Sequence, residues 1–435
     1  MQHIRSAPIS RLFRFSSPAT RDKRNNAVIR EMFECIFDEL NDANAFVHAE
    51  LLLNNESNHD DILPNSSFQS TEFVPQVFYI RTVNDVPCPE LFKHDSPFMS
   101  SKMFKYLREK ANVCLTFSCR IKERDIHVHF ITYGAENGDI REMIVKHQVY
   151  VYRVYMWLSI ILKASTSVCS RTLHIYFYMT PLKKELPGEM TATLGSDNVN
   201  TGVSRGCISN GEIVVYREEE WFKVFVHETM HNFGMDFLDR DLTQANEVLH
   251  TMYPGITHEV LLFEAYTELW ARIINISFVA YFMPATKTFT GFLHFVRDGM
   301  EIETYFSAYQ CAKVLDYMEL DYATLISKER ENVVKTHERY AENTNVFAYY
   351  VLCGGVLFQN YDIFFKWCGG LPAHGNCKIP IRFSQTIPSF MKLLKDVYQN
   401  ESTIQSTKNG EKALLSGESH HELSKTLRMT IVEHL

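Results

Sequence analysis

The chain has 435 residues, of which 46% are hydrophobic and 22% charged, and this composition predicts a globular protein with a large buried core. Its net charge of −8 argues against nucleic acid as the main partner. No apolar stretch reaches the length of a membrane span, because the most apolar one, residues 149–162, is interrupted by Arg153. The ten cysteines are scattered without a C-x-x-C pair, which favours reduced thiols in a cytosol-like compartment over a disulfide framework.

The first 110 residues are expected to form two segments that precede the main core in the chain. Residues 1–30 carry seven Lys and Arg against one acidic residue, Asp22, and we predict a disordered basic arm. A mitochondrial transit peptide has a similar composition and is the alternative, whereas a secretory signal peptide is not expected. Residues 31–110 predict an N-terminal α/β segment that starts with a helix, continues through a polar linker at residues 54–71 and ends in short strands and turns.

Residues 111–290 are predicted to form the core of the protein. Two stretches of alternating apolar and polar residues, 113–121 and 126–133, predict a β-hairpin. A long aromatic-rich helix is expected at residues 140–163, followed by a strand at residues 173–179. This order of elements predicts an α+β fold with a mixed sheet.

The segment Glu218–Phe233 predicts a buried helix with a polar notch. Acidic residues at its start suit the positive end of the helix dipole, and Gly234 just beyond it is a natural stop. His227, Glu228 and His231 spell H-E-x-x-H, and residues four apart lie about 40° from each other around a helix, so both imidazoles can bind one ion. Glu228 can then contact a water on that ion without being a ligand. Two hydrogen-bonded histidines in an ordinary buried helix are the alternative interpretation.

A second helix is predicted from Phe263 onward, with two carboxylates on one face. A catalytic zinc takes three protein ligands and leaves a fourth position to water. Glu264 can be the third ligand, and Glu268, one turn further on, can accept the free ring N–H of His227 and fix its tautomer. The alternative is an acidic pair on a solvated helix face, but the apolar residues on both sides argue against full exposure.

The H-E-x-x-H sequence followed by Glu264-x-x-x-Glu268 resembles the gluzincins, which are zinc metallopeptidases with two histidines and a glutamate as ligands. The metzincins are a rival resemblance, because Gly234 fits their H-E-x-x-H-x-x-G pattern and Met252 lies in a sequence that looks like their Met-turn. Their third ligand would fall one place after Asp236, on a phenylalanine that cannot bind a metal. The gluzincin resemblance is therefore the better one.

The gluzincin resemblance implies a zincin-like core at residues 111–290 with a metal-binding active-site helix. It also implies that the strand just before that helix presents an open edge that pairs with an extended substrate. The residues in that place are Asn200, Thr201 and Gly202. A plain hairpin that only leads into the helix is an equally good interpretation of these residues.

The remainder of the chain is predicted to be mostly helical. Residues 291–400 are expected to form a helical C-terminal lobe that closes the cleft. Tyr349 or Tyr350 could donate a hydrogen bond to the oxyanion of a tetrahedral intermediate, although core packing is the alternative in a chain with 21 tyrosines. Residues 401–435 are polar, and we expect disorder or one loose terminal helix.

These features predict a zinc-dependent metallopeptidase that binds Zn²⁺ and hydrolyses a polypeptide substrate, with Glu228 as the general base. The competing interpretation is a non-catalytic metal-binding protein with a structural or virion-associated role, in which His250 or His258 could fill the fourth metal position. Residues 200–237 also resemble, more loosely, uncharacterised H-E-x-x-H proteins of large cytoplasmic DNA viruses. A cytoplasmic or virion-associated location is therefore expected, with the mitochondrial matrix as the alternative. The sequence does not define an oligomeric state.

Overall fold

The computed structural model describes most of the chain. The described residues are 27–52, 73–92, 101–133, 140–188, 193–283, 288–369, 377–416 and 421–433. The predicted basic arm lies outside them up to residue 26, and so does the whole of the predicted linker at residues 54–71.

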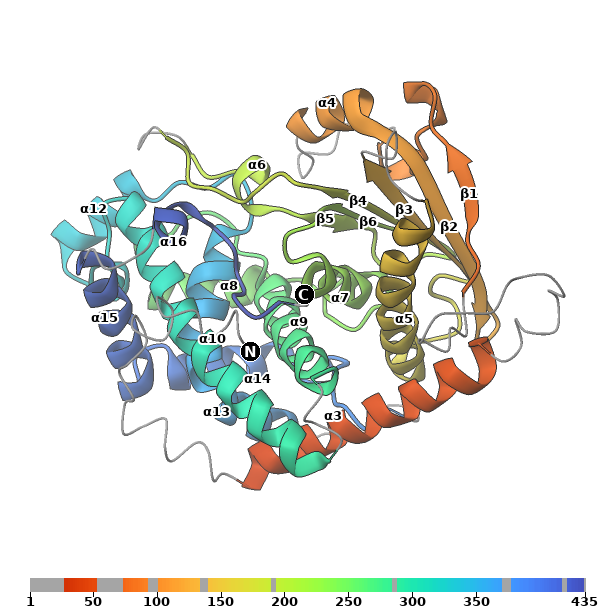
Figure 1. Ribbon diagram of the computed structural model, residues 1–435. Helices are drawn as coiled ribbons and strands as arrows, with labels where there is room; N and C mark the ends of the chain where they lie inside the picture. The colour runs from red at the N-terminus through yellow and green to blue at the C-terminus, as the bar shows by residue number, and fades with distance from the viewer. Residues whose placement is uncertain are drawn as a thin grey trace, which may run out of the picture.

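A mixed sheet of six strands forms one side of the molecule (Figure 1). The strands are β1 (Gln76–Tyr79), β2 (Ala111–Ile121), β3 (Arg124–Tyr133), β4 (Thr172–Thr180), β5 (Gly202–Ser204) and β6 (Asn210–Arg217). Their order in space is β1-β2-β3-β4-β6-β5, with the β3–β4 and β4–β6 pairs parallel and the other pairs antiparallel. The predicted β2–β3 hairpin is confirmed, and its turn residues Lys122 and Glu123 both have the positive φ angles that a two-residue hairpin loop requires.

Helices make up most of the remaining described chain. They are α3 (Ala27–Phe46), α4 (Ser101–Lys110), α5 (Ile140–Ala164), α6 (Ser196–Val199), α7 (Trp221–Asn232), α8 (Thr243–Met252), α9 (Leu262–Tyr281), α10 (Phe289–Tyr317), α11 (Tyr322–Ile326), α12 (Arg330–Arg339), α13 (Tyr361–Gly369), α14 (Ile387–Val397), α15 (Glu401–Leu415) and α16 (His421–Lys425), with π-helical segments η1 (Val47–Leu52) and η5 (Phe347–Leu357). The predicted α+β class, with a mixed sheet and a helical C-terminal region, is confirmed. Within these described stretches, none of the helices combines the length and the apolar character that crossing a membrane requires.

The two faces of the sheet are covered differently. Helices α5 and α7 lie beneath the strands in Figure 1 and cover one face. Along β3, the side chains of Ile126, Val128 and Phe130 are fully buried in the same core as these helices, as the period-two pattern predicts. Helix α4 packs on the other face through a smaller apolar cluster.

Helix α9 joins the sheet side of the molecule to the helical side. It is buried from Leu262 to Ala280. Its neighbours are α7 on one side and α3, α10 and η5 on the other. Because α7 and α9 are packed on all sides, side chains that face each other between these two helices are held in a rigid setting.

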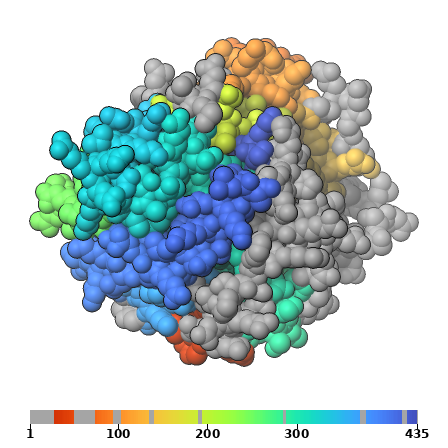
Figure 2. All heavy atoms as spheres, turned by 90° about the vertical axis from the view of Figure 1, so that its left-hand side faces the viewer, coloured from red at the N-terminus to blue at the C-terminus, as the bar shows by residue number. Residues whose placement is uncertain are grey.

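The described residues after 400, which are 401–416 and 421–433, are part of the folded body, so the expectation of disorder or one loose helix is wrong for them. In α15, Thr403, Thr407 and Gly410 form a buried stripe that packs on α10. A side chain at Gly410 would lie 2.3 Å from the carbonyl oxygen of Ala308, so glycine allows this close approach. Figure 2 shows the late residues, in blue, packed directly against the cyan helical region. Because small and polar residues can also form a helix–helix interface, the polar composition of this segment did not indicate that it is packed.

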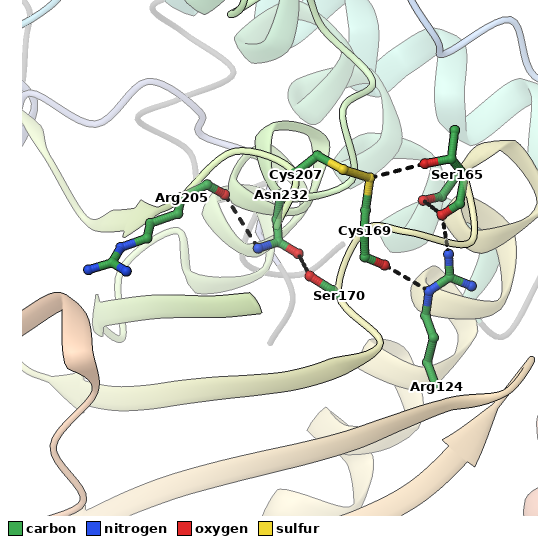
Figure 3. Close-up of a disulfide and its surroundings, with 8 residues drawn as sticks. Arg124, Ser165, Cys169, Ser170, Arg205, Cys207 and Asn232 are labelled. Atoms are coloured by element: carbon green, nitrogen blue, oxygen red, sulfur yellow. Dashed lines mark hydrogen bonds between the residues drawn. A yellow bond between two sulfur atoms is a disulfide. The ribbon is translucent and has the colours of Figure 1, made fainter. Parts of the chain in front are cut away.

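A disulfide joins Cys169 and Cys207, so the expectation of reduced thiols is wrong for these two residues. The other eight cysteines form no disulfide. The bridge ties the chain before β4 to the loop between β5 and β6 (Figure 3). Beside it, the hydroxyl of Ser170 donates to Asn232 Oδ1 over 2.5 Å and so anchors the end of α7. The two cysteines are 38 positions apart without a motif, and only the tertiary fold brings them together.

Candidate metal centre

The predicted helix at Glu218–Phe233 is confirmed as α7, and every residue of α7 is buried. Gly234 takes the left-handed conformation with φ 64°, and the N–H of Met235 donates to the carbonyl of Met230, which closes the helix as the sequence predicted. The acidic residues at the predicted start lie just before the helix rather than in its first turn, with Glu220 as the last of them.

Two histidines from α7 and one glutamate from α9 direct their side chains to a common point. His227 Nε2 lies 3.0 Å from His231 Nε2 and 3.1 Å from Glu264 Oε2, and His231 Nε2 lies 3.5 Å from the same carboxylate oxygen. Within the part of the chain that the structure describes, these three residues are the one His, Cys, Asp and Glu group arranged to hold a metal ion. Ligand atoms around a tetrahedral zinc are about 3.3–3.5 Å apart, so each of these distances is within about 0.3 Å of that spacing.

The charges around this point also fit a divalent cation. The buried carboxyl groups of Asp236, Glu228, Glu264 and Glu268 surround the histidines. Lys223 contacts one of these carboxylates, that of Glu268. Such an excess of buried negative charge is costly unless a cation offsets it. Protons on both histidines could supply that charge, but they would place two N–H groups facing each other across 3.0 Å. A bound cation, held by His227, His231 and Glu264, would offset this charge and would satisfy both rings and the carboxylate together.

The other ring nitrogen of each histidine is held by a carboxylate. His227 Nδ1 lies 3.1 Å from Glu268 Oε2, as the sequence predicted, and His231 Nδ1 makes a short hydrogen bond with Asp236. Burial opposes the charge of Glu268, but Lys223 and His227 outweigh it and hold the pKa of this carboxyl at about 2. A carboxylate behind each imidazole directs Nε2 toward the metal position. The sequence analysis considered Asp236 only as an alternative ligand and missed this role.

Glu228 lies beside the metal position without joining the three converging atoms. The hydroxyl of Ser204 on β5 donates to Glu228 Oε2 over 2.7 Å, which leaves Oε1 for another partner. Burial raises the pKa of Glu228, and the two histidines and Ser204 offset this only in part. A raised pKa suits a carboxylate that accepts a proton near neutral pH.

The predicted substrate edge is placed next to Glu228. Gly202 starts β5, the outermost strand of the sheet, and a Cβ there would lie 2.6 Å from Val224 Cγ1 and 3.0 Å from Glu228 Oε1. Only glycine allows β5 to approach α7 this closely. Asn200 and Thr201 lie just before the strand, where their carbonyls accept from Arg217 and from the N–H of Tyr216 respectively.

Of the two candidate tyrosines, the structure brings only Tyr349 to the centre. Its hydroxyl donates to Glu264 Oε2 over 2.9 Å, and Asn345 donates to the other oxygen of Glu264 over 3.1 Å. Tyr350 points away and donates to the carbonyl of Leu427. Tyr349 lies in the π-helical segment η5, a conformation that is frequent at functional sites. The sequence offered no signal for Asn345.

The histidines considered for the fourth metal position lie elsewhere. His250 Nε2 bonds to the carbonyl of His258, and His258 Nε2 lies 2.8 Å from Glu342 Oε1. Neither residue belongs to the converging group in the described chain. The centre therefore offers three candidate ligand atoms, from His227, His231 and Glu264, with the Glu228 carboxylate beside them.

The chain matches no protein-family model, no curated protein and no solved structure.

Proposed function

We propose that the protein is a zinc-dependent metallopeptidase of the gluzincin type. The observation that supports this proposal is the combination of three converging ligand atoms with a buried carboxylate, Glu228, beside them. A site whose only task is structural has no use for such a carboxylate, and it normally carries a fourth protein ligand.

In this proposal His227, His231 and Glu264 hold the zinc. When bound, the zinc supplies a water of lowered pKa and a Lewis acid for a substrate carbonyl. Glu228 takes up a proton of that water at Oε1, since Ser204 already donates to Oε2. It then passes the proton to the amine that leaves when the peptide bond breaks. The raised pKa of Glu228 favours the first of these transfers, the uptake of the proton.

The substrate in this proposal is an extended polypeptide. The outer edge of β5 is unpaired within the described residues, and it runs past Glu228. An extended chain that adds to this edge has its peptide groups aligned with the metal position. Burial and the nearby Glu264 hold the pKa of Tyr349 well above its ordinary value, so its phenol stays neutral. Its one O–H donates to Glu264 Oε2 in this structure, and it would have to turn from that carboxylate to donate to a developing oxyanion.

A second candidate function is a metal-binding structural protein. Its support is the tight enclosure of Glu264, since Asn345 and Tyr349 both hydrogen-bond to it.

Disulfides form in oxidising settings more readily than in the cytosol, so the Cys169–Cys207 bridge favours a virion-associated over a cytoplasmic location under either function.

A metal analysis tests the proposed site directly. The purified protein should contain about one zinc per chain, and His227→Ala/His231→Ala should contain none. Cys88→Ala, which changes an exposed residue outside the centre, is the control and should retain the metal. Stoichiometric metal in the double variant would place the binding site elsewhere and refute the proposal.

A further inference from the structure

A ladder of opposite charges continues the metal centre along α7 and α9. Lys223, His227 and His231 are spaced four residues apart and share one face of α7. Glu264 and Glu268 share the facing side of α9. The helices run antiparallel, because His231 meets Glu264 whereas Lys223 meets Glu268, and His227 contacts both glutamates. Lys223 is thus the next member of the series that contains the two histidines.

The ammonium group of Lys223 fixes both oxygens of Glu268. Lys223 Nζ donates to Oε1 over 2.9 Å and to Oε2 over 3.1 Å. Oε2 is also the atom that lies 3.1 Å from Nδ1 of His227. The side chains of Lys223 and Glu268 are 2% and 1% exposed, so water does not compete for these contacts.

A distant segment of the chain seals Lys223 in this position. Lys223 Nζ lies 3.7 Å from the sulfur of Met429, and 3.9 Å from Glu220 Oε1. That oxygen of Glu220 also accepts the backbone N–H groups of Met429 and Thr430, over 2.8 and 2.7 Å. Met429 and Thr430 are buried. The ammonium group therefore contacts Met429 and Glu220 in addition to Glu268.

We propose that Lys223 is a positioning residue of the metal centre, which holds Glu268 in the orientation that directs His227 toward the metal. This inference rests on the metal site of the proposed function, but not on peptide hydrolysis. Without Lys223, both oxygens of Glu268 lose the ammonium group, Oε2 keeps its contact with His227, and the carboxylate can rotate away from the imidazole. Loss of the group that orients a histidine ligand weakens metal binding.

A double-mutant cycle in the full-length protein tests this inference, with zinc affinity measured by competition against a chelator. Lys223→Met should weaken zinc binding by about tenfold, and Glu268→Gln by about 10–100-fold. The double variant should bind zinc no more weakly than Glu268→Gln alone, because Lys223 acts through Glu268. Lys223→Arg, which retains the charge and its donors, should recover most of the affinity.

Lys184 provides the matched control. It is a buried lysine that pairs with Glu220 over 2.7 Å, and the described contacts give it no hydrogen bond to Glu268. Lys184→Met therefore removes a similar buried charge from the same network, and it should leave zinc affinity unchanged. If Lys223→Met does not fold, Lys223→Gln, which is uncharged but polar, is measured in its place against the same expectations.

Three results would overturn the inference: a Lys223 variant that binds zinc within twofold of wild type, an equal loss in Lys184→Met, or additive losses in the cycle. A wild type that binds zinc but cleaves no peptide refutes the proposed peptidase and leaves the role of Lys223 intact. A wild type that binds no zinc refutes both.

Discussion

Removing the disulfide between Cys169 and Cys207 should lower the free energy of unfolding by about 4 kcal/mol. The bridge joins residues 38 positions apart. A cross-link that closes a loop of that size lowers the conformational entropy of the unfolded chain, which raises the free energy of the unfolded state by about 4 kcal/mol at 25 °C. The native contacts beside it, such as Ser170 with Asn232, do not depend on the sulfur atoms. The effect should therefore arise mainly in the unfolded state.

The assay is urea unfolding of wild type and of Cys169→Ala/Cys207→Ala, followed by fluorescence and by circular dichroism. Cys88→Ala, which removes an exposed thiol that belongs to no disulfide, is the control and should change the stability by less than about 0.5 kcal/mol. Mass spectrometry after thiol labelling shows whether the bridge is present in the wild type. A bridged wild type that is less than about 1 kcal/mol more stable than the double alanine variant would refute the loop argument, and labels on Cys169 and Cys207 would refute the bridge itself.

Two further predictions concern the metal centre. Glu264→Gln should weaken zinc binding more than Glu268→Gln does, because it removes a charged ligand rather than the partner of His227. Calorimetric titration with zinc measures both affinities. A larger loss in Glu268→Gln would mean that Glu268, and not Glu264, is the ligand. Gly202→Ala should destabilise the protein by about 1–3 kcal/mol, since its methyl group would overlap Val224, and a melting temperature equal to that of wild type would contradict the close packing of β5 on α7.

The elements that the sequence predicted well are those with a strong local period. The alternation in β3 placed Ile126, Val128 and Phe130 on one face, and all three are buried there. The sequence predicted the helix with His227 and His231 equally well, because its apolar residues, its end at Gly234 and the spacing of its histidines are all local signals.

The parts that the sequence did not predict depend on residues far apart in the chain. Ser204 reaches Glu228 only because β5 is the outermost strand next to α7, and Asn345 reaches Glu264 across 81 positions. The Cys169–Cys207 bridge has the same origin. The buried segment around Met429 was mistaken for a loose tail, since its backbone is held by side chains of other elements and not by a pattern of its own.

The most direct test of the central claim is Glu228→Gln, measured for zinc content and for cleavage of a mixed peptide library on the same preparation. This change preserves the size of the side chain and its contact with Ser204, but the amide cannot accept the proton of a water. We expect about one zinc per chain in both proteins, cleavage by the wild type, and a rate reduced by about 10²-fold or more in the variant. A wild type that binds zinc but cleaves no library peptide, with a variant that melts at a higher temperature, would contradict the peptidase and support a structural metal site.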